Sequence, residues 1–175
     1  CASLIINESF FKESLEMRRL LLRGMDALIT NVPGYCVCVT TADCVPVLLY
    51  DKKQHVVAAV HAGWKGTVKH IVSHVMDHLN KMFGTQGEDV IACIGPSISL
   101  ESFEVGDEVY DAFEESGFDM SLISMKKKET GKYHIDLWEA NRIELLNLGV
   151  PAEQIEVAGI CTYIHHDEFF SARRL

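Results

Sequence analysis

The chain carries little positive charge. Its 175 residues include 16 Lys and Arg against 25 Asp and Glu, which gives a formal net charge of −9. The basic runs are short, namely Lys126–Lys128 and the pairs Arg18–Arg19, Lys52–Lys53 and Arg173–Arg174. Because the phosphate backbone of nucleic acids attracts clustered Lys and Arg, this balance argues against a nucleic-acid partner.

Long apolar runs are absent as well. No stretch approaches the roughly 20 apolar residues of a transmembrane helix, and no signal-peptide pattern opens the sequence. The sequence contains no internal repeat and no heptad pattern. We therefore expect a cytoplasmic protein without a membrane partner, with residues 1–175 folded as a single domain.

A disulfide framework is also not indicated. The six cysteines lie mostly within apolar, strand-like runs rather than in the loops where secreted proteins place their bridges. We predict that five of them are buried thiols.

Strands and helices alternate along the chain. Hydrophobic periodicity and Gly or Pro breaks predict a long amphipathic helix after Gly66 that ends at Gly84, and Asp136 with Glu139 resembles a helix capping box. This alternation predicts a mixed α/β class, with a sheet that is covered on two sides. The other predicted elements are helices over 7–23 and 106–115 and strands over 4–6, 26–30, 36–40, 44–50, 55–61, 89–94, 134–135 and 155–158.

The strands 44–50 and 55–61 flank a polar break and predict a hairpin. If the turn is symmetric about Lys52 and Lys53, Cys44 lies directly opposite His61. Opposed residues on antiparallel strands place their Cβ atoms roughly 4.5–5.5 Å apart. A thiol and an imidazole would then meet, although Pro46 could introduce a bulge that turns them apart.

Taken alone, the pair Cys44 and His61 allows three interpretations. Both residues could be ordinary core side chains, they could form a nucleophilic pair, or they could be two ligands of a zinc site that needs a third. Asp43 beside the cysteine offers a carboxylate for orientation or proton transfer. Lys65 lies where a helix begins, and the positive end of a helix can hold an anion. These neighbours favour a functional site.

Three histidines, His70, His74 and His78, are spaced four residues apart on the predicted helix. Such a ladder can bind metal, but no Cys or carboxylate completes it, so we interpret it as a solvated helix face.

Seven short motifs follow one another along nearly the whole chain. Together they resemble the YfiH family, whose members have been called multicopper polyphenol oxidoreductases or laccase-domain proteins and are regarded as purine nucleoside phosphorylases. The motifs are Thr41–Cys44 with Pro46, His61–Trp64 with Gly66, Ile94–Ser97, Phe103–Gly106, Asp136–Leu137 with Asn141, Arg142 and Leu145, Cys161–Thr162, and Phe170–Arg174.

The resemblance implies a mixed-sheet layered sandwich of the YfiH and toxin-deamidase type. It also implies a zinc site of one Cys and two His, at which adenosine or inosine is cleaved with phosphate. Adenosine deamination and 5′-methylthioadenosine phosphorolysis are attributed to the same pocket. The family's ligands fall on Cys44 and His61, and its other histidine is expected just before Cys1.

On this basis we expect a chain that lacks its N-terminal segment and extreme C-terminus, and that binds metal weakly or not at all by itself. Asp43, Cys44 and His61 are the candidate catalytic residues. The candidate contacts to purine nucleoside and phosphate are Trp64, Lys65, Ser97, Arg173 and Arg174.

Each of these contacts also has a plainer interpretation. Trp64 could pack the helix on the sheet, Ser97 could shape a loop, and the two arginines could be a solvated terminus. Lys65 stands where the family more often has Arg, which keeps the charge but loses the two-pronged grip on phosphate. We expect a monomer or a weak homodimer.

Other functions remain open. A copper-dependent laccase needs many histidines, usually in His-x-His pairs, and none of the eight histidines forms one. Copper is nevertheless a possible alternative to zinc. A metal-free Cys–His hydrolase and a non-enzymatic binding domain are the other two alternatives.

Overall fold

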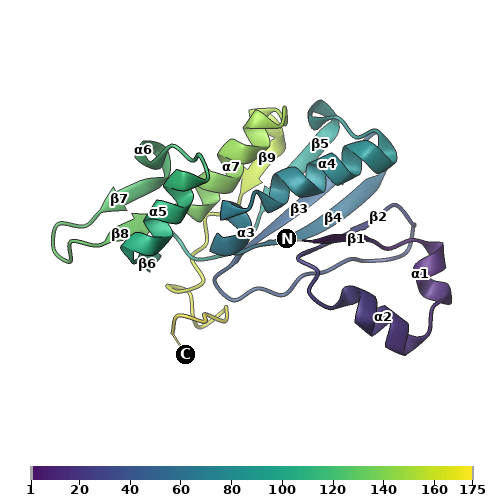
Figure 1. The fold of residues 1–175 in the computed structure, drawn as a ribbon, viewed down its shortest axis with the longest axis horizontal. Helices are drawn as coiled ribbons and strands as arrows, with labels where there is room; N and C mark the ends of the chain where they lie inside the picture. The colour runs from purple at the N-terminus through teal and green to yellow at the C-terminus, as the bar shows by residue number, and fades with distance from the viewer. Residues whose placement is uncertain (1, 175) are drawn as a thin grey trace.

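A six-stranded mixed sheet, in the order β1-β2-β4-β3-β5-β9, forms the centre of the computed structural model, which describes residues 2–174 (Figure 1). The inner strands are antiparallel, whereas each edge strand, β1 and β9, runs parallel to its neighbour. This confirms the predicted α/β class with a mixed sheet. The strands are β1 Ser3–Ile5, β2 Ala27–Thr30, β3 Val45–Asp51, β4 Val56–Ala62, β5 Val90–Ile94 and β9 Ile155–Val157.

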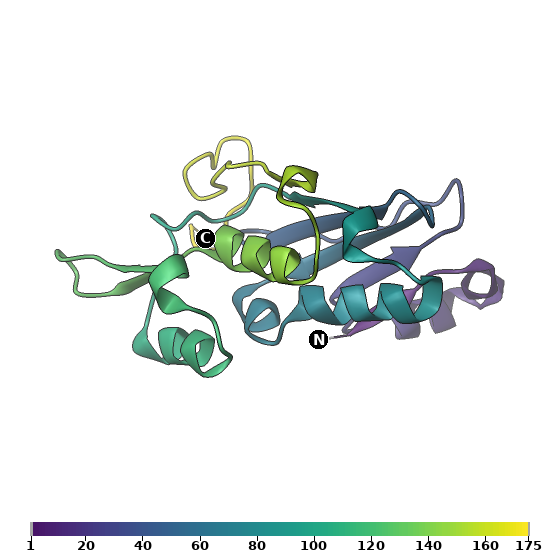
Figure 2. The ribbon, with the colours of Figure 1, turned by 90° about the horizontal axis from the view of Figure 1, so that it is seen from above.

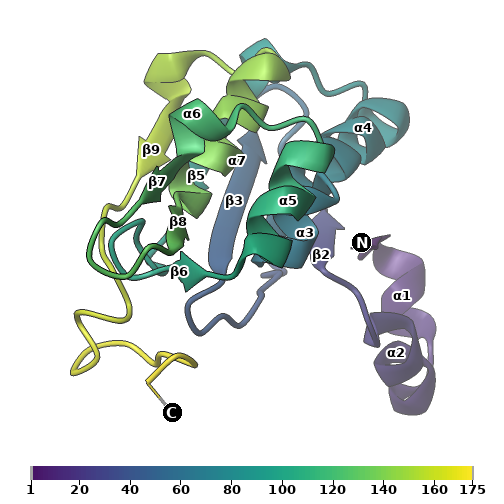
Figure 3. The ribbon, with the colours of Figure 1, turned by 60° about the vertical axis from the view of Figure 1, so that its left-hand side comes forward.

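A smaller antiparallel sheet, in the order β6-β8-β7, stands at one end of the large sheet together with α5 and α6 (Figure 1, Figure 3). Helices α1 and α2 lie at the opposite end. The small sheet comprises β6 Glu104–Val105, β7 Ser124–Lys126 and β8 Tyr133–Ile135. The helices are α1 Glu8–Lys12, α2 Leu15–Leu22, α3 Trp64–Val68, α4 Ile71–Phe83, α5 Asp107–Glu115, α6 Met120–Ile123 and α7 Leu137–Asn147, with 3₁₀ turns η1 Gly87–Asp89 and η2 Ala152–Gln154.

Helices α4 and α7 lie side by side on one face of the large sheet (Figure 2). The residues of β3 that point to them, Val45, Val47 and Leu49, are at most 3% exposed. On the opposite face of the same strand, Leu48 is 52% exposed. Among the described residues, no helix covers that second face, so the expected cover on both sides of the sheet is not found there.

The β3–β4 hairpin forms with a different register from the one predicted. His61 pairs with Pro46 rather than with Cys44, because the turn is centred one residue later. The Asp51 carboxylate sets this turn: its Oδ1 accepts the backbone N–H groups of Lys53 and Gln54 at 2.8 and 2.9 Å. A shift of the pairing by two residues preserves the alternation of side chains, so Cys44 and His61 still share a face.

Pro46 causes no bulge. The ladder between β3 and β4 is continuous from Val45 to Asp51, and the Pro46 carbonyl accepts the N–H of Gly95 at 2.9 Å. The missing N–H of the proline is tolerated because the ladder to β5 begins only at Val47.

The helix predicted after Gly66 is interrupted. It begins earlier, at Trp64, and breaks at His70, whose φ of +54° lies in the left-handed region. Beyond the break, α4 buries Ile71, Val72, Val75, Met76 and Leu79 in the helical spacing that was predicted, and Gly84 ends it with φ +74°. Among the described residues, the three histidines do not form one metal site. His78 Nδ1 is bonded to Ser3 Oγ, whereas His74 is exposed.

Two further predictions near the N-terminus are wrong. The helix predicted over 7–23 is two helices, since Ser14 caps a second one, and neither contains a buried residue. Residues 36–40 form no strand ladder within the described chain.

The prediction of buried cysteines also fails. Cys36, Cys38 and Cys93 are exposed, Cys44 is half-buried and Cys161 is buried, while Cys1 lies outside the described residues. No helix among residues 2–174 is long and apolar enough to cross a membrane.

Candidate functional site

Cys44 and His61 meet around Gly63. A Cβ atom built on Gly63 would lie 2.9 Å from Cys44 Sγ and 3.7 Å from His61 Nε2. The sulfur and the ring nitrogen therefore border the same small space, which is open only because residue 63 has no side chain. Both residues lie on the sheet face that points away from α4 and α7, and both are half-buried.

Asp43 anchors the C-terminal segment beside this pair. Its carboxylate is 9% exposed and accepts three hydrogen bonds, from Thr162 Oγ1 at 2.8 Å, Ser171 Oγ at 3.0 Å and the backbone N–H of Arg173 at 2.8 Å. Because buried carboxylates need such donors, the loop before β3 and the last residues of the chain are held together.

The Cys44 thiol is kept protonated by its surroundings. Burial raises the pKa of Cys44, and the negative charge of Asp43 raises this pKa further. Both effects disfavour a thiolate, so a thiolate at Cys44 needs compensating positive charge, such as a metal ion would provide.

Trp64 and Lys65 open α3 directly after Gly63. Trp64 is half-buried and packs against the core, and Lys65 is exposed with its Nζ 5.4 Å from the centre of the Trp64 ring. α3 has only five residues, so its dipole adds little to the charge of Lys65 at this position.

Ser97 lies in the loop after β5 and is completely buried. Its hydroxyl accepts the indole N–H of Trp138 at 2.6 Å and donates to the Gly95 carbonyl at 3.1 Å. Its backbone forms an isolated bridge to Cys161. Ser97 thus joins the loop, α7 and the C-terminal segment.

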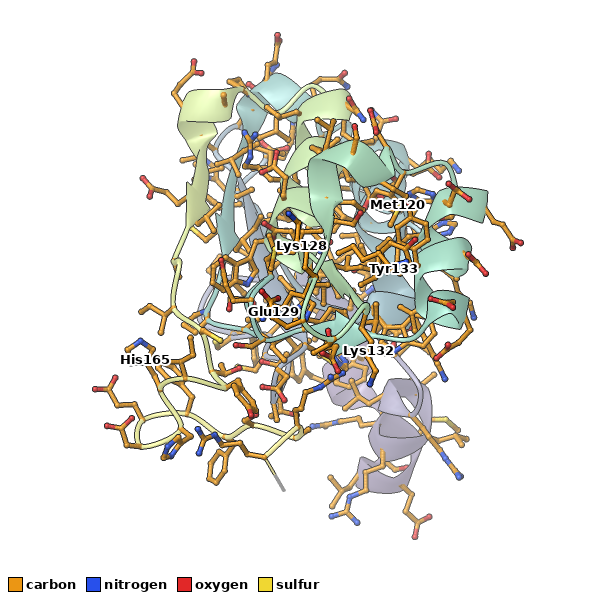
Figure 4. All side chains as sticks on the ribbon, turned by 90° about the vertical axis from the view of Figure 1, so that its left-hand side faces the viewer. Met120, Lys128, Glu129, Lys132, Tyr133 and His165 are labelled. Carbon is orange, nitrogen blue, oxygen red and sulfur yellow. The ribbon has the colours of Figure 1, made fainter. Side chains whose placement is uncertain are left out.

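Arg173 and Arg174 are exposed at the end of the described chain. Arg173 donates from Nη1 to the Glu104 carbonyl at 2.6 Å, and Arg174 donates from Nε to the Tyr163 carbonyl at 3.0 Å. His165 lies on the same C-terminal segment, apart from Tyr133 of β8 and Lys132 in the loop before it (Figure 4).

A cavity of about 270 Å³ adjoins His61. It is lined by Met25 and Leu28 on one side and by Cys38 and Thr40 on the other. The sequence pattern predicts a strand over 36–40 and gives no sign of this cavity.

Sequence reasoning also did not assign roles to Gly63, Trp138, Thr162 or Ser171. Thr162 and Ser171 occur within recognised motifs, but their bonds to Asp43 span 119 and 128 residues. No local pattern predicts such a contact.

The donor set fits two positions of a metal site. A thiolate and an imidazole are the ligands that zinc prefers in proteins, and Cys44 Sγ and His61 Nε2 both border the space at Gly63. Within residues 2–174, no group of three or more His, Cys, Asp or Glu side chains could hold a metal ion.

The sequence and the mixed α/β fold match a known class of protein. A sequence model described as "Multi-copper polyphenol oxidoreductase laccase" matches residues 6–175. The chain belongs to this family, the YfiH family.

Three similar proteins illustrate the relationship. "Purine nucleoside phosphorylase" of Bacteroides thetaiotaomicron is 63% identical over 172 residues, which are 98% of this chain and 64% of that protein. "Adenosine deaminase RL5" of an unknown prokaryotic organism is 42% identical over 175 residues, which are 100% of this chain and 66% of that protein. The crystal structure of YlmD from Geobacillus stearothermophilus superposes with a TM-score of 0.87 at 30% identity, over 98% of this chain and 64% of that one. The chain thus spans less than two thirds of the length of these relatives.

Proposed function

We propose that the protein containing this chain is a zinc-dependent purine nucleoside phosphorylase that acts on adenosine, inosine and 5′-methylthioadenosine. The observation that carries the proposal is the convergence of Cys44 Sγ and His61 Nε2 at Gly63. The name of the Bacteroides relative, which is 63% identical, supports the assignment of the reaction.

Cys44 and His61 would hold the zinc ion, together with a histidine expected before Cys1. A bound zinc ion supplies Lewis-acid charge to the site. Because the pKa of the Cys44 thiol is raised by burial and by Asp43, Cys44 must release a proton when the metal binds. Zinc affinity should therefore increase with pH.

Asp43 acts as a positioning residue in this proposal. By accepting the N–H of Arg173, it holds the backbone that carries the two terminal arginines next to Cys44.

Phosphate would be bound by Lys65 and by Arg173 or Arg174. Each guanidinium has five N–H donors, and a bond to one backbone carbonyl leaves donors for the phosphate oxygens. The cavity beside His61 offers apolar walls for the purine, and Trp64 offers an aromatic ring nearby. Ser97 would support the site indirectly, through its bonds to Trp138 and Gly95.

The test uses the full-length protein with its Cys44→Ala and His61→Ala variants. Cys93→Ala is the matched control, because Cys93 is an exposed thiol on the same sheet. We expect zinc in the wild type and the control, phosphate-dependent release of hypoxanthine from inosine, and loss of both in the two site variants. Equal zinc content in folded Cys44→Ala protein would contradict the proposal.

Adenosine deamination is a second candidate, favoured by the relative named adenosine deaminase, which is 42% identical. Inosine formed from adenosine without phosphate would support it. Metal analysis of the same samples distinguishes zinc from copper. Activity that is retained without metal, and lost when iodoacetamide alkylates Cys44, would favour a metal-free Cys–His hydrolase instead.

A further inference from the structure

A second cavity, of about 420 Å³, lies where α6 and α7 meet the start of α4 and the loop after α5. None of the residues proposed above for nucleoside, phosphate or zinc lines it. Its polar lining is His70, Ser73, Asp119, Glu144 and Asn147, and its apolar wall includes Phe118, Leu122 and Ile143.

Glu144 supplies negative charge to this cavity. It is 5% exposed, and its Oε1 accepts both the backbone N–H and the hydroxyl of Ser73, at 3.0 and 2.6 Å. Its other oxygen, Oε2, is buried and has no hydrogen-bond partner among the described residues. A buried carboxylate oxygen without a donor is costly.

His70 lies beside this carboxylate. Its Nε2 lies 3.0 Å from the Ser116 carbonyl oxygen, which can only accept, so Nε2 carries a hydrogen. Its Nδ1 lies 3.5 Å from Glu144 Oε1. The ring is fixed in place by stacking on Phe118, with a centroid distance of 5.1 Å.

A carboxylate and an imidazole therefore border the cavity, and no Lys or Arg lines it within the described residues. Phe118, Leu122 and Ile143 continue the cavity with apolar surface, and Leu122 is 60% exposed. A ligand that pairs with the carboxylate must bring N–H donors and positive charge, and one that fills the rest must have an apolar body.

We propose that this cavity binds an organic cation, namely a primary ammonium or an amidinium group attached to an aromatic or branched apolar body. The cationic group pairs with the Glu144 carboxylate beside the His70 ring, and the body lies against Phe118 and Leu122. Charge-assisted hydrogen bonds of this kind are the strong ones.

Benzamidine is the probe, and benzamide, which has nearly the same shape without the charge, is its neutral counterpart. Titration of the full-length protein, followed by methyl and aromatic NMR signals of Leu122 and Phe118, should show saturable binding of benzamidine. Benzamide should bind at least about tenfold more weakly, the factor expected for one lost hydrogen bond to a charged group.

Glu144→Gln tests the carboxylate itself. The glutamine can still accept from Ser73 through its carbonyl oxygen, but it presents an amide donor in place of Oε2. We expect benzamidine binding to fall to the level of benzamide, whereas the exposed Glu153→Gln should leave it unchanged. Equal binding of the two probes by the wild type, or no saturable binding of either, would overturn the proposal even if the variant did not fold.

Discussion

Trp138 donates its indole N–H to Ser97 Oγ at 2.6 Å, which joins α7 to the loop after β5. Replacing Ser97 by Ala removes the acceptor and leaves the indole N–H without a partner in a half-buried position. We expect Ser97→Ala to lower the free energy of unfolding by about 1–3 kcal/mol, as measured by urea denaturation.

A double-mutant cycle with Trp138→Phe separates this bond from a general packing defect. If the bond is the cause, the double variant should lose little more stability than the larger of the two single losses. Additive losses would mean that Ser97 and Trp138 stabilise the fold independently.

Gly63 and Gly66 form a matched pair for testing the space between Cys44 and His61. A methyl group at Gly63 would lie 2.9 Å from Cys44 Sγ, which is too close, whereas one at Gly66 would meet its nearest atoms at an ordinary 3.5 Å. We expect Gly63→Ala to abolish zinc retention by the full-length protein. Gly66→Ala lies within α3, where alanine is favoured by about 0.5–1 kcal/mol, and should retain the metal. Loss of zinc from both variants would contradict the specific role of Gly63.

Asp51 should contribute to stability against acid. Burial raises the pKa of Asp51, but the nearby Thr85 hydroxyl, the backbone N–H groups of Gln54 and Lys53 and the charge of Lys53 outweigh it, so this pKa is lowered. A carboxyl group with a lowered pKa in the folded state stabilises the fold above its unfolded pKa and loses that contribution as pH falls through the folded value. Asp51→Asn should therefore show a shallower loss of unfolding free energy between neutral and acidic pH. An unchanged pH profile would contradict this prediction.

The pKa of Asp136 is shifted in the opposite direction from that of Asp51. Burial is the main reason that the pKa of Asp136 is raised, although its Oδ1 caps α7 by accepting the N–H of Glu139 at 3.0 Å. Its charge state therefore favours folding at low pH, and this contribution is lost as pH rises through the folded pKa. Asparagine keeps the cap without the charge.

At neutral pH we accordingly expect Asp136→Asn to be as stable as the wild type or more stable. Asp136→Ala removes the cap and should cost about 1 kcal/mol. Chemical denaturation of the three proteins at acidic and neutral pH checks both expectations, and an asparagine variant as unstable as the alanine variant would contradict them.

The hairpin shows how far the sequence alone leads. The symmetric turn correctly predicts that Cys44 and His61 share a face, because the observed pairing differs from the predicted one by two residues and so keeps the alternation of side chains. The pairing register between β3 and β4 depends on the Asp51 side chain. Its two hydrogen bonds within the turn move the centre of the turn by one residue from the predicted position. Hydrophobic pattern carries no information about that shift.

Contacts distant in sequence account for the other differences. The break between α3 and α4 occurs at His70, which is held by Ser116 and lies beside Glu144, 46 and 74 residues away along the chain. Periodicity places the buried residues of α4 correctly but cannot indicate these partners. In the same way, the space at Gly63 depends on the pairing of β3 with β4, which the sequence pattern does not reveal.

Asp43 meets two separate demands, and together they limit which amino acid can occupy this position. Its φ of +79° lies in the left-handed region, which mainly Gly, Asn and Asp tolerate. Its side chain also accepts three hydrogen bonds. Glycine has no acceptor. Asparagine can keep the bonds from Ser171 and Arg173 through its carbonyl oxygen, and its amide N–H can donate to the Thr162 hydroxyl, which can also accept. A library of all replacements at position 43, selected for folded protein, should therefore return aspartate and asparagine.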